Sequence, residues 1–234
     1  HKLINSTKLE NTMGSVYSDG KSFKSQIAKT IFDYADFLNI RVPTACGRTG
    51  ECHECIVEIS NGMQSLSPLT ESESFLRGNY RLACQASVVS DNNDIEFATL
   101  RRQPRILTDS ISRIVELDPS ATRIDNSVYI GNTKVSDFRN GVYGLAGDIG
   151  TTTIVLNIVD LETGQIVLTS SFENPQRFGG SDVMNRISYD GSDNTGELQQ
   201  VMLSSINFEV GEMVKELAIH RRDIFDAVLV GNTT

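Results

Sequence analysis

The sequence predicts an α+β protein with two folded parts and a linker between them. Strand and helix patterns alternate around a cysteine-rich loop in residues 1–98, and a new run of strands and helices begins at Val142. Residues 99–141 are rich in Arg, Asp, Ser and Asn, which indicates a linker with one or two strands or turns. The 234 residues are 39% hydrophobic and 22% charged, a globular composition that is sufficient for one large or two small cores.

The first part is predicted to be a small β-grasp domain over residues 1–98. Residues 15–24 predict two strands around a turn at Asp19-Gly20, and apolar residues then recur at helical spacing over residues 25–38. Further strands are expected at 56–59, 81–89 and 94–98, with a short helix after Pro68. A hairpin, a helix, a loop and further strands, in this order, are typical of a β-grasp domain.

The loop between this helix and the next strand holds Cys46, Cys52 and Cys55, and Cys84 lies in a later strand. Three closely spaced thiolates and one distant thiolate can enclose a [2Fe–2S] cluster, although the plant-type spacing is one residue shorter in its first gap. Gly47 and Gly50 in this loop allow backbone conformations that side chains forbid. The sequence therefore predicts these four cysteines as metal ligands.

Zinc and unligated thiols are the alternatives to an iron–sulfur cluster. Structural zinc usually shows two close Cys or Cys/His pairs, whereas this sequence has a single C-x2-C pair. A disulfide framework is unusual in a chain of this length with four cysteines and no secretory signal. A Rieske centre needs two histidines, so we expect His53 to be an exposed loop residue.

The second part contains a candidate phosphate motif where its first strand ends. Gly150 lets a phosphate approach the backbone, and the amides and hydroxyls of Thr151, Thr152 and Thr153 can donate to its oxygens. Asp148 can hold Mg²⁺ through water. The alternative is a hairpin turn built from ordinary turn residues.

The elements that follow favour the phosphate interpretation. Strands are predicted at 154–159 and 165–170, helices at 181–189 and 197–220, and a final strand at 226–231 that is apolar enough to be buried. This order is the one expected of an actin-like nucleotide-binding half-domain.

The charge and hydrophobicity of the sequence argue against nucleic-acid and membrane partners. The formal net charge is -9, and neither a basic run nor aromatic residues interleaved with Lys and Arg suggest nucleic acid. No apolar run reaches membrane-spanning length and no secretory signal is visible, so we expect no membrane partner and a cytoplasmic location.

The motifs together resemble the corrinoid protein reductive activators, in which a ferredoxin domain is fused to an ATPase of the actin, sugar kinase and heat-shock chaperone superfamily. The matching segments run from residue 46 to the C-terminus in the order CGRTGECHEC (46–55), SPLTE (67–71), RLACQ (81–85), YGLAGDIGTTT (143–153), NPQ (174–176), GSDVMNRI (180–187) and VGNTT (230–234). The combination is specific, although each segment alone is not.

The resemblance implies an activity and its cofactors. It makes Cys46, Cys52, Cys55 and Cys84 ligands of a [2Fe–2S] cluster, and Asp148 with residues 150–153 the first phosphate motif for ATP and Mg²⁺ in the full-length protein. Family members use ATP to help return an inactive Co(II) corrinoid to Co(I) for methyl transfer. The implied partners are a corrinoid protein or methyltransferase component and an upstream electron donor, and no residue is assigned a catalytic role.

The resemblance also implies that residues 142–234 begin an actin-like (ribonuclease H-like) ATPase domain. Both ends of the chain look cut, so we expect a fragment that is incomplete for ATP hydrolysis. The interval before the ATPase residues is short, and we expect a separate middle domain to be missing. The competing hypotheses are a simple ferredoxin-type electron carrier with a non-catalytic docking domain, and a zinc-stapled interaction protein.

Overall fold

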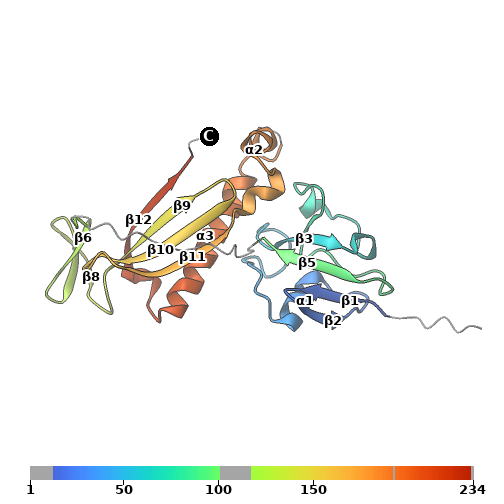
Figure 1. Ribbon diagram of the computed structural model, residues 1–234, viewed down its shortest axis with the longest axis horizontal. Coiled ribbons are helices and arrows are strands. Elements are labelled where there is room, and N and C mark those ends of the chain that lie inside the picture. The colour runs from blue at the N-terminus through green and yellow to red at the C-terminus, as the bar shows by residue number, and fades with distance from the viewer. Residues whose placement is uncertain (1–12, 101–116, 192, 233–234) are drawn as a thin grey trace, which may run out of the picture. The chain divides into compact units, whose positions relative to one another are not determined.

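The computed structural model describes residues 13–100, 117–191 and 193–232, which form two compact units (Figure 1). The boundary between the units falls between Thr99 and Leu100. The first unit contains one sheet and the second contains two, and each unit has its own buried side chains.

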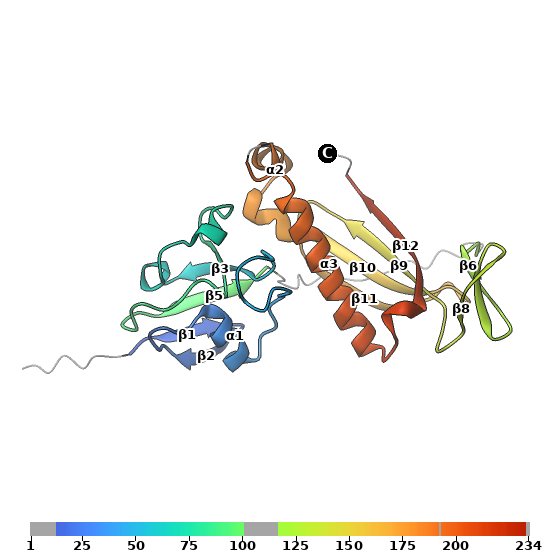
Figure 2. The ribbon, with the colours of Figure 1, turned by 180° about the vertical axis from the view of Figure 1, so that it is seen from behind.

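The first unit is a five-stranded mixed sheet with one α-helix packed on it, which agrees with the predicted β-grasp order. Strand β1 pairs in parallel with β5, and the other neighbours are antiparallel. Helix α1 lies against β1 and β2 (Figure 2). In sheet order the strands are β2 (Lys21–Lys24), β1 (Ser15–Ser18), β5 (Ile95–Thr99), β3 (Ile56–Asn61) and β4 (Tyr80–Leu82), and the helix is α1 (Ile31–Leu38).

Helix α1 begins six residues later than the periodicity predicts. The Thr30 hydroxyl accepts a hydrogen bond from the Asp33 amide at 3.1 Å, and the Asp33 carboxylate accepts one from the Thr30 amide at 2.9 Å. This capping box fixes the N-terminus of the helix, and Thr30 is also bridged to Ser87 as extended backbone. Asn39 ends the helix in the left-handed conformation, with φ of 55°.

The second unit is organised around a four-stranded sheet in the order β11-β10-β9-β12. Strands β9, β10 and β11 form an antiparallel meander, and β12 returns parallel to β9 after two helices. Helix α3 crosses one face of this sheet (Figure 2). The elements are β9 (Tyr143–Ile149), β10 (Thr153–Asp160), β11 (Ile166–Glu173), α2 (Val183–Asp190), α3 (Glu197–Glu216) and β12 (Ile224–Gly231).

Apolar side chains hold α3 on the sheet. Ile154, Leu156 and Ile158 alternate along β10 and are fully buried, as the period of two in a strand requires. They pack against Met202, Ile206, Val210 and Met213 of α3, which recur at helical spacing.

Strand β12 differs from the sequence prediction of a buried strand. Val228, Leu229 and Val230 are 58%, 49% and 57% exposed. Within the described part of the chain β12 pairs only with β9 and forms the sheet edge, whereas the buried core centres on β10, β11 and α3. The apolar composition of β12 correctly predicted a strand, but the prediction that its side chains are buried was wrong.

Residues 117–141, predicted to be linker, also differ from the expectation. They form the antiparallel strands β6 (Ala121–Ile124), β7 (Ser127–Ile130) and β8 (Thr133–Asp137). Buried Ala121 and Val128 pack with Val142, and Arg139 donates from Nε to Asp223 at 2.7 Å. These strands are therefore part of the second unit, and residues 101–116 of the predicted linker lie outside the described residues.

No helix within the described ranges is both long and apolar enough to cross a membrane.

Candidate functional site

The first unit brings Cys55 and Cys84 together from different strands. Cys55 precedes β3 and Cys84 follows β4, and these strands pair with Ile56 opposite Leu82. As a result the two Sγ atoms lie 3.4 Å apart, although 29 residues separate them in the sequence. A disulfide is about 2.05 Å long, so the pair consists of two free thiols.

Cys46 and Cys52 lie in the loop before β3 and are partly exposed. The Ala45 amide donates to Cys52 Sγ at 3.5 Å. Gly50 has φ of 93°, and a Cβ there would lie 2.8 Å from Gln85 Nε2, so this turn of the loop requires glycine. The same Gln85 donates from Nε2 to Cys84 Sγ at 3.5 Å, which joins the loop to the fourth cysteine.

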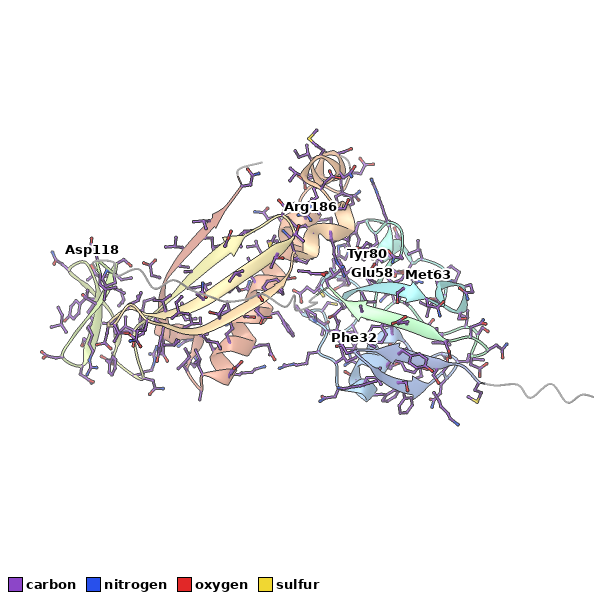
Figure 3. The ribbon with its side chains drawn as sticks, viewed as in Figure 1. Phe32, Glu58, Met63, Tyr80, Asp118 and Arg186 are labelled. Atoms are coloured by element: carbon purple, nitrogen blue, oxygen red, sulfur yellow. The ribbon has the colours of Figure 1, made fainter. Side chains whose placement is uncertain are left out.

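Arg48 attaches the exposed loop to helix α1. Its guanidinium carbon lies 3.9 Å from the ring centre of Phe32, labelled in Figure 3, and its Nη2 lies 2.7 Å from Asp36 Oδ2. Partly exposed contacts of this kind contribute about 0.5–1 kcal/mol each. The contacts therefore orient the loop more than they stabilise the unit.

His53 is not the exposed residue that the sequence predicted. It is partly buried and stacks on Phe75 with ring centres 4.1 Å apart. It also has φ of 55°, a left-handed conformation that histidine adopts more readily than most side chains. Its ring therefore packs against the domain.

The four cysteines are a donor set of the kind that a two-iron cluster uses. A [2Fe–2S] cluster divides four thiolates between two irons. The close pair Cys55 and Cys84, with two further cysteines on a loop, suits that division.

Hydrogen bonds prepare two of the thiols to become thiolates. The hydrogen bond from Thr49 lowers the pKa of Cys46 to about 5. The Cys55 thiol donates to Cys84, which lowers the pKa of Cys84 to about 7 and, together with burial, raises the pKa of Cys55. The thiolate is the form that binds metals. Cys46 and Cys84 therefore lose their protons more easily than Cys55 when a metal binds.

A buried ion pair fixes the strand that leads to Cys84. Arg81 Nε donates to Glu73 Oε1 at 2.7 Å, and the Leu82 amide donates to the same oxygen at 2.9 Å. Glu73 and Arg81 are 0% and 2% exposed. Burial raises the pKa of Glu73, but hydrogen bonds from Arg81 and from the amides of Thr70 and Leu82 outweigh it, so the net pKa is lowered. Sequence reasoning missed this pair, although Thr70-x-x-Glu73 has the capping-box pattern.

The predicted phosphate residues form a tight turn between β9 and β10. The Gly150 amide donates to the Thr153 carbonyl at 3.0 Å, and a Cβ on Gly150 would lie 2.5 Å from that oxygen. The turn therefore requires glycine for close packing of its own backbone. This geometry is the hairpin that the alternative interpretation describes, and Asp148 is exposed at the end of β9.

Asn174 holds this turn, and sequence reasoning assigned it no role. Its Nδ2 donates to the Gly150 carbonyl at 2.9 Å, and its backbone amide donates to the Thr152 carbonyl at 2.7 Å. Its Oδ1 accepts from the Gln176 amide at 2.9 Å, and Asn174 is 2% exposed. The only sequence feature that pointed to Asn174 was the segment NPQ (174–176), one of the segments that resemble the corrinoid protein reductive activators.

A pocket of about 600 Å³ lies beside the turn. Gly150 and Thr151 line it, whereas Asp148, Thr152 and Thr153 do not. The structure therefore brings two of the five predicted phosphate-binding residues to the pocket wall. Its other polar lining residues are Asn174, Gln176, Arg186, Asp190, Gln199 and Asn232.

Two family models match the chain. Residues 16–89 match the 2Fe-2S iron-sulfur cluster binding domain, and residues 143–234 match the RACo middle region. The first match confirms the ferredoxin-type domain. The second match covers the residues that we assigned to the start of the ATPase domain.

Known proteins with similarity to the chain include corrinoid activators. A corrinoid activation enzyme, RamQ of Eubacterium limosum, is 22% identical over 87% of this chain and 42% of its own length. A solved structure of a reductive activator for a corrinoid, iron-sulfur protein is 23% identical, covering 94% of this chain and 47% of that one, with a TM-score of 0.46. A [2Fe-2S] ferredoxin from Pseudomonas putida is 19% identical over 39% of this chain and 98% of its own, with a TM-score of 0.32.

The family models and the curated relative confirm the resemblance that the sequence predicted. The chain spans less than half of the length of that relative.

Proposed function

We propose that this chain, a homologue of the corrinoid reductive activators, transfers electrons to a corrinoid protein and so restores Co(I) from Co(II) for methyl transfer. Cys46, Cys52, Cys55 and Cys84 would hold a [2Fe–2S] cluster. When bound, such a cluster supplies a one-electron couple, which matches the single electron that separates Co(II) from Co(I). An upstream electron donor would restore that electron.

The observation that carries this proposal is the convergence of the cysteines within a ferredoxin-type domain. Cys84 comes within 3.4 Å of Cys55 through strand pairing, and the partly exposed Cys46 and Cys52 lie in the adjoining loop. An exposed loop suits electron transfer, because transfer needs close approach to a partner. Thiolate ligands also need reducing conditions, so we propose a cytoplasmic location.

We also propose that ATP with Mg²⁺ acts through the second unit, in the full-length protein. Three antiparallel strands, two helices and a parallel strand follow the order expected of the first half of an actin-like (ribonuclease H-like) ATPase. A pocket beside residues 150–153 supports a phosphate site there. In this proposal the amides and hydroxyls of the turn bind phosphate, and Asp148 orients the metal through water.

The decisive experiment combines metal analysis with a reduction assay. The purified protein is expected to contain two irons and two acid-labile sulfides per chain, as a [2Fe–2S] cluster requires. Reduction of a Co(II) corrinoid protein, followed by its visible spectrum, should then require both an electron donor and ATP. Stoichiometric zinc without iron or visible absorbance would reject the cluster assignment.

A simple electron carrier with a docking domain remains the second candidate. Asp148, Thr152 and Thr153 are not among the pocket-lining residues, and residues 150–153 make an ordinary hairpin contact. If the full-length protein reduces the corrinoid partner equally fast with and without ATP, the second unit serves docking and the nucleotide proposal fails.

A further inference from the structure

Arg186 is a buried cation with unused hydrogen-bonding capacity. It lies on α2, is labelled in Figure 3, and is 8% exposed. Its Nε donates to the Gly180 carbonyl at 2.9 Å. Within the described ranges its two terminal nitrogens make no further hydrogen bond. They are therefore available to an anion in the pocket that Arg186 lines.

Nearby carboxylates do not supply that anion. Asp182 accepts hydrogen bonds from the backbone and side-chain nitrogens of Asn185 at 2.9 and 2.6 Å, as the N-cap of α2. Asp190 accepts from the Gly196 amide at 3.0 Å, just before α3. Burial lowers the pKa of Arg186, with Asp182 opposing that effect, and an arginine still carries its charge at neutral pH.

Arg186 faces the same pocket as the turn between β9 and β10. It is the only Lys or Arg among the residues that line this pocket, which also include Gly150 and Thr151. Apolar residues such as Val183, Met202 and Leu203 also line the pocket. A charge-assisted hydrogen bond from Arg186 would be stronger here the more water the ligand displaces.

We infer that Arg186 binds a phosphate group in this pocket, opposite the turn at Gly150 and Thr151. A guanidinium can bind two phosphate oxygens at once, so it would also orient the group. The ligand is either free phosphate or the terminal phosphate of a nucleotide. This inference rests on the proposed function and adds to it a binding residue outside the motif at residues 148–153.

The test is a titration of the 234-residue chain followed by nitrogen-15 NMR, with inorganic phosphate, ADP and ATP as separate ligands. Phosphate should shift the Nε–H signal of Arg186 and the amide signals of Gly150 and Thr151. Arg186→Gln should weaken phosphate binding about tenfold or more, because a hydrogen bond to a charged group is lost. Arg186→Lys should weaken it less, since the charge remains.

Arg222→Gln is the matched control. Arg222 is an exposed arginine of the same unit that does not line the pocket, so this variant makes the same change in net charge and should keep the wild-type affinity. Unchanged amide signals along α3 verify that each variant is folded. A difference between the ATP and inorganic phosphate affinities separates a nucleotide site from a free-phosphate site.

An Arg186 signal that does not move at saturating phosphate, or equal affinities of Arg186→Gln and the wild type, would overturn the inference. ATP-dependent corrinoid reduction by the full-length protein would in that case still support the proposed function. Conversely, phosphate binding at Arg186 without any ATP effect on reduction would remove the nucleotide from the proposed function and leave Arg186 as a phosphate ligand.

Discussion

Cys84 is the candidate ligand that lies farthest in sequence from the loop with the other three cysteines. Cys84→Ser should remove or strongly weaken the cluster, since a closed shell of four thiolates needs every member. Loss of visible absorbance and of bound iron measures the effect.

His53→Asn is the matched control for Cys84→Ser. It changes a residue adjacent to Cys52 that stacks on Phe75, and asparagine tolerates the left-handed backbone at this position. It should therefore retain iron. Loss of iron in this variant and its retention in Cys84→Ser would reverse the ligand assignment.

The buried pair of Glu73 and Arg81 predicts a specific acid sensitivity. The folded-state pKa of Glu73 lies below its unfolded value, so its contribution is complete above the unfolded pKa and is lost as pH falls through the folded pKa. The free energy of unfolding should therefore fall below the range where ordinary glutamates titrate, and fall less steeply in Glu73→Gln. Denaturant unfolding of chelator-treated protein at several pH values measures this, with exposed Glu96→Gln as the unchanged control.

Removing the cation of this pair has a larger predicted effect. Arg81→Met leaves the Glu73 carboxylate buried without its main partner, which should lower the free energy of unfolding of the first unit by about 3–5 kcal/mol. The midpoint of denaturant unfolding checks this value. A change below about 1 kcal/mol would mean that water replaces Arg81 at Glu73.

Single residues were predictable where their chemistry is carried by spacing. The cysteine pattern identified the ferredoxin-type domain because ligand spacing is local in sequence. Glu73 lies in the short helix Glu71–Glu73 and Arg81, eight residues later, lies in β4. The two side chains meet only in the folded unit, so no periodic pattern in the sequence indicated the pair. Arg186 belongs to the segment at residues 180–187 that carries part of the family resemblance, but nothing in that segment indicated its burial. Its burial depends on the packing of α2 against the short helix Pro175–Gly179.

Among the elements, the hairpin of β9 and β10 depends on Asn174, which follows β11. Asn174→Ala removes the donor to the Gly150 carbonyl and the acceptor for the Gln176 amide. Leaving buried backbone groups unpaired costs about 1–3 kcal/mol, and the free energy of unfolding of the second unit should fall by that amount.

Asn157→Ala provides the comparison for this variant. Asn157 is partly exposed on β10, where its side chain accepts from the Thr169 hydroxyl at 2.7 Å. Its loss should cost less than about 1 kcal/mol, because water can replace the contact. Equal losses in the two asparagine variants would show that Asn174 does not hold the turn.

Elements were predictable in type more often than in boundary or burial. Alternation in β10 and helical spacing in α3 reflect a single buried face, so local pattern was sufficient. Strand β12 is apolar throughout, yet its exposure depends on its place at the sheet edge, which composition does not encode. Polar residues in β6, β7 and β8 resembled a linker because this small sheet buries few side chains.

For the chain as a whole, the α+β class and the division into two units followed from the sequence, because each unit has a separate core. Limited proteolysis should therefore leave a coloured product that contains residues 46–84. Because β6, β7 and β8 pack on the second unit, the partner fragment should begin before Leu117. Mass spectrometry of the products gives the cut sites, and cleavage within 46–84 ahead of any cut between the cores would contradict independent units.

The contacts around Cys84 have a consequence for the direction from which the candidate cluster site can be reached. Glu73, Arg81 and the pairing of β3 with β4 hold Cys55 beside Cys84 inside the first unit. Cys55 and Cys84 are buried, whereas Cys46 and Cys52 are partly exposed. A redox partner would therefore approach these cysteines from the side of the loop, and electrons would enter and leave the protein there.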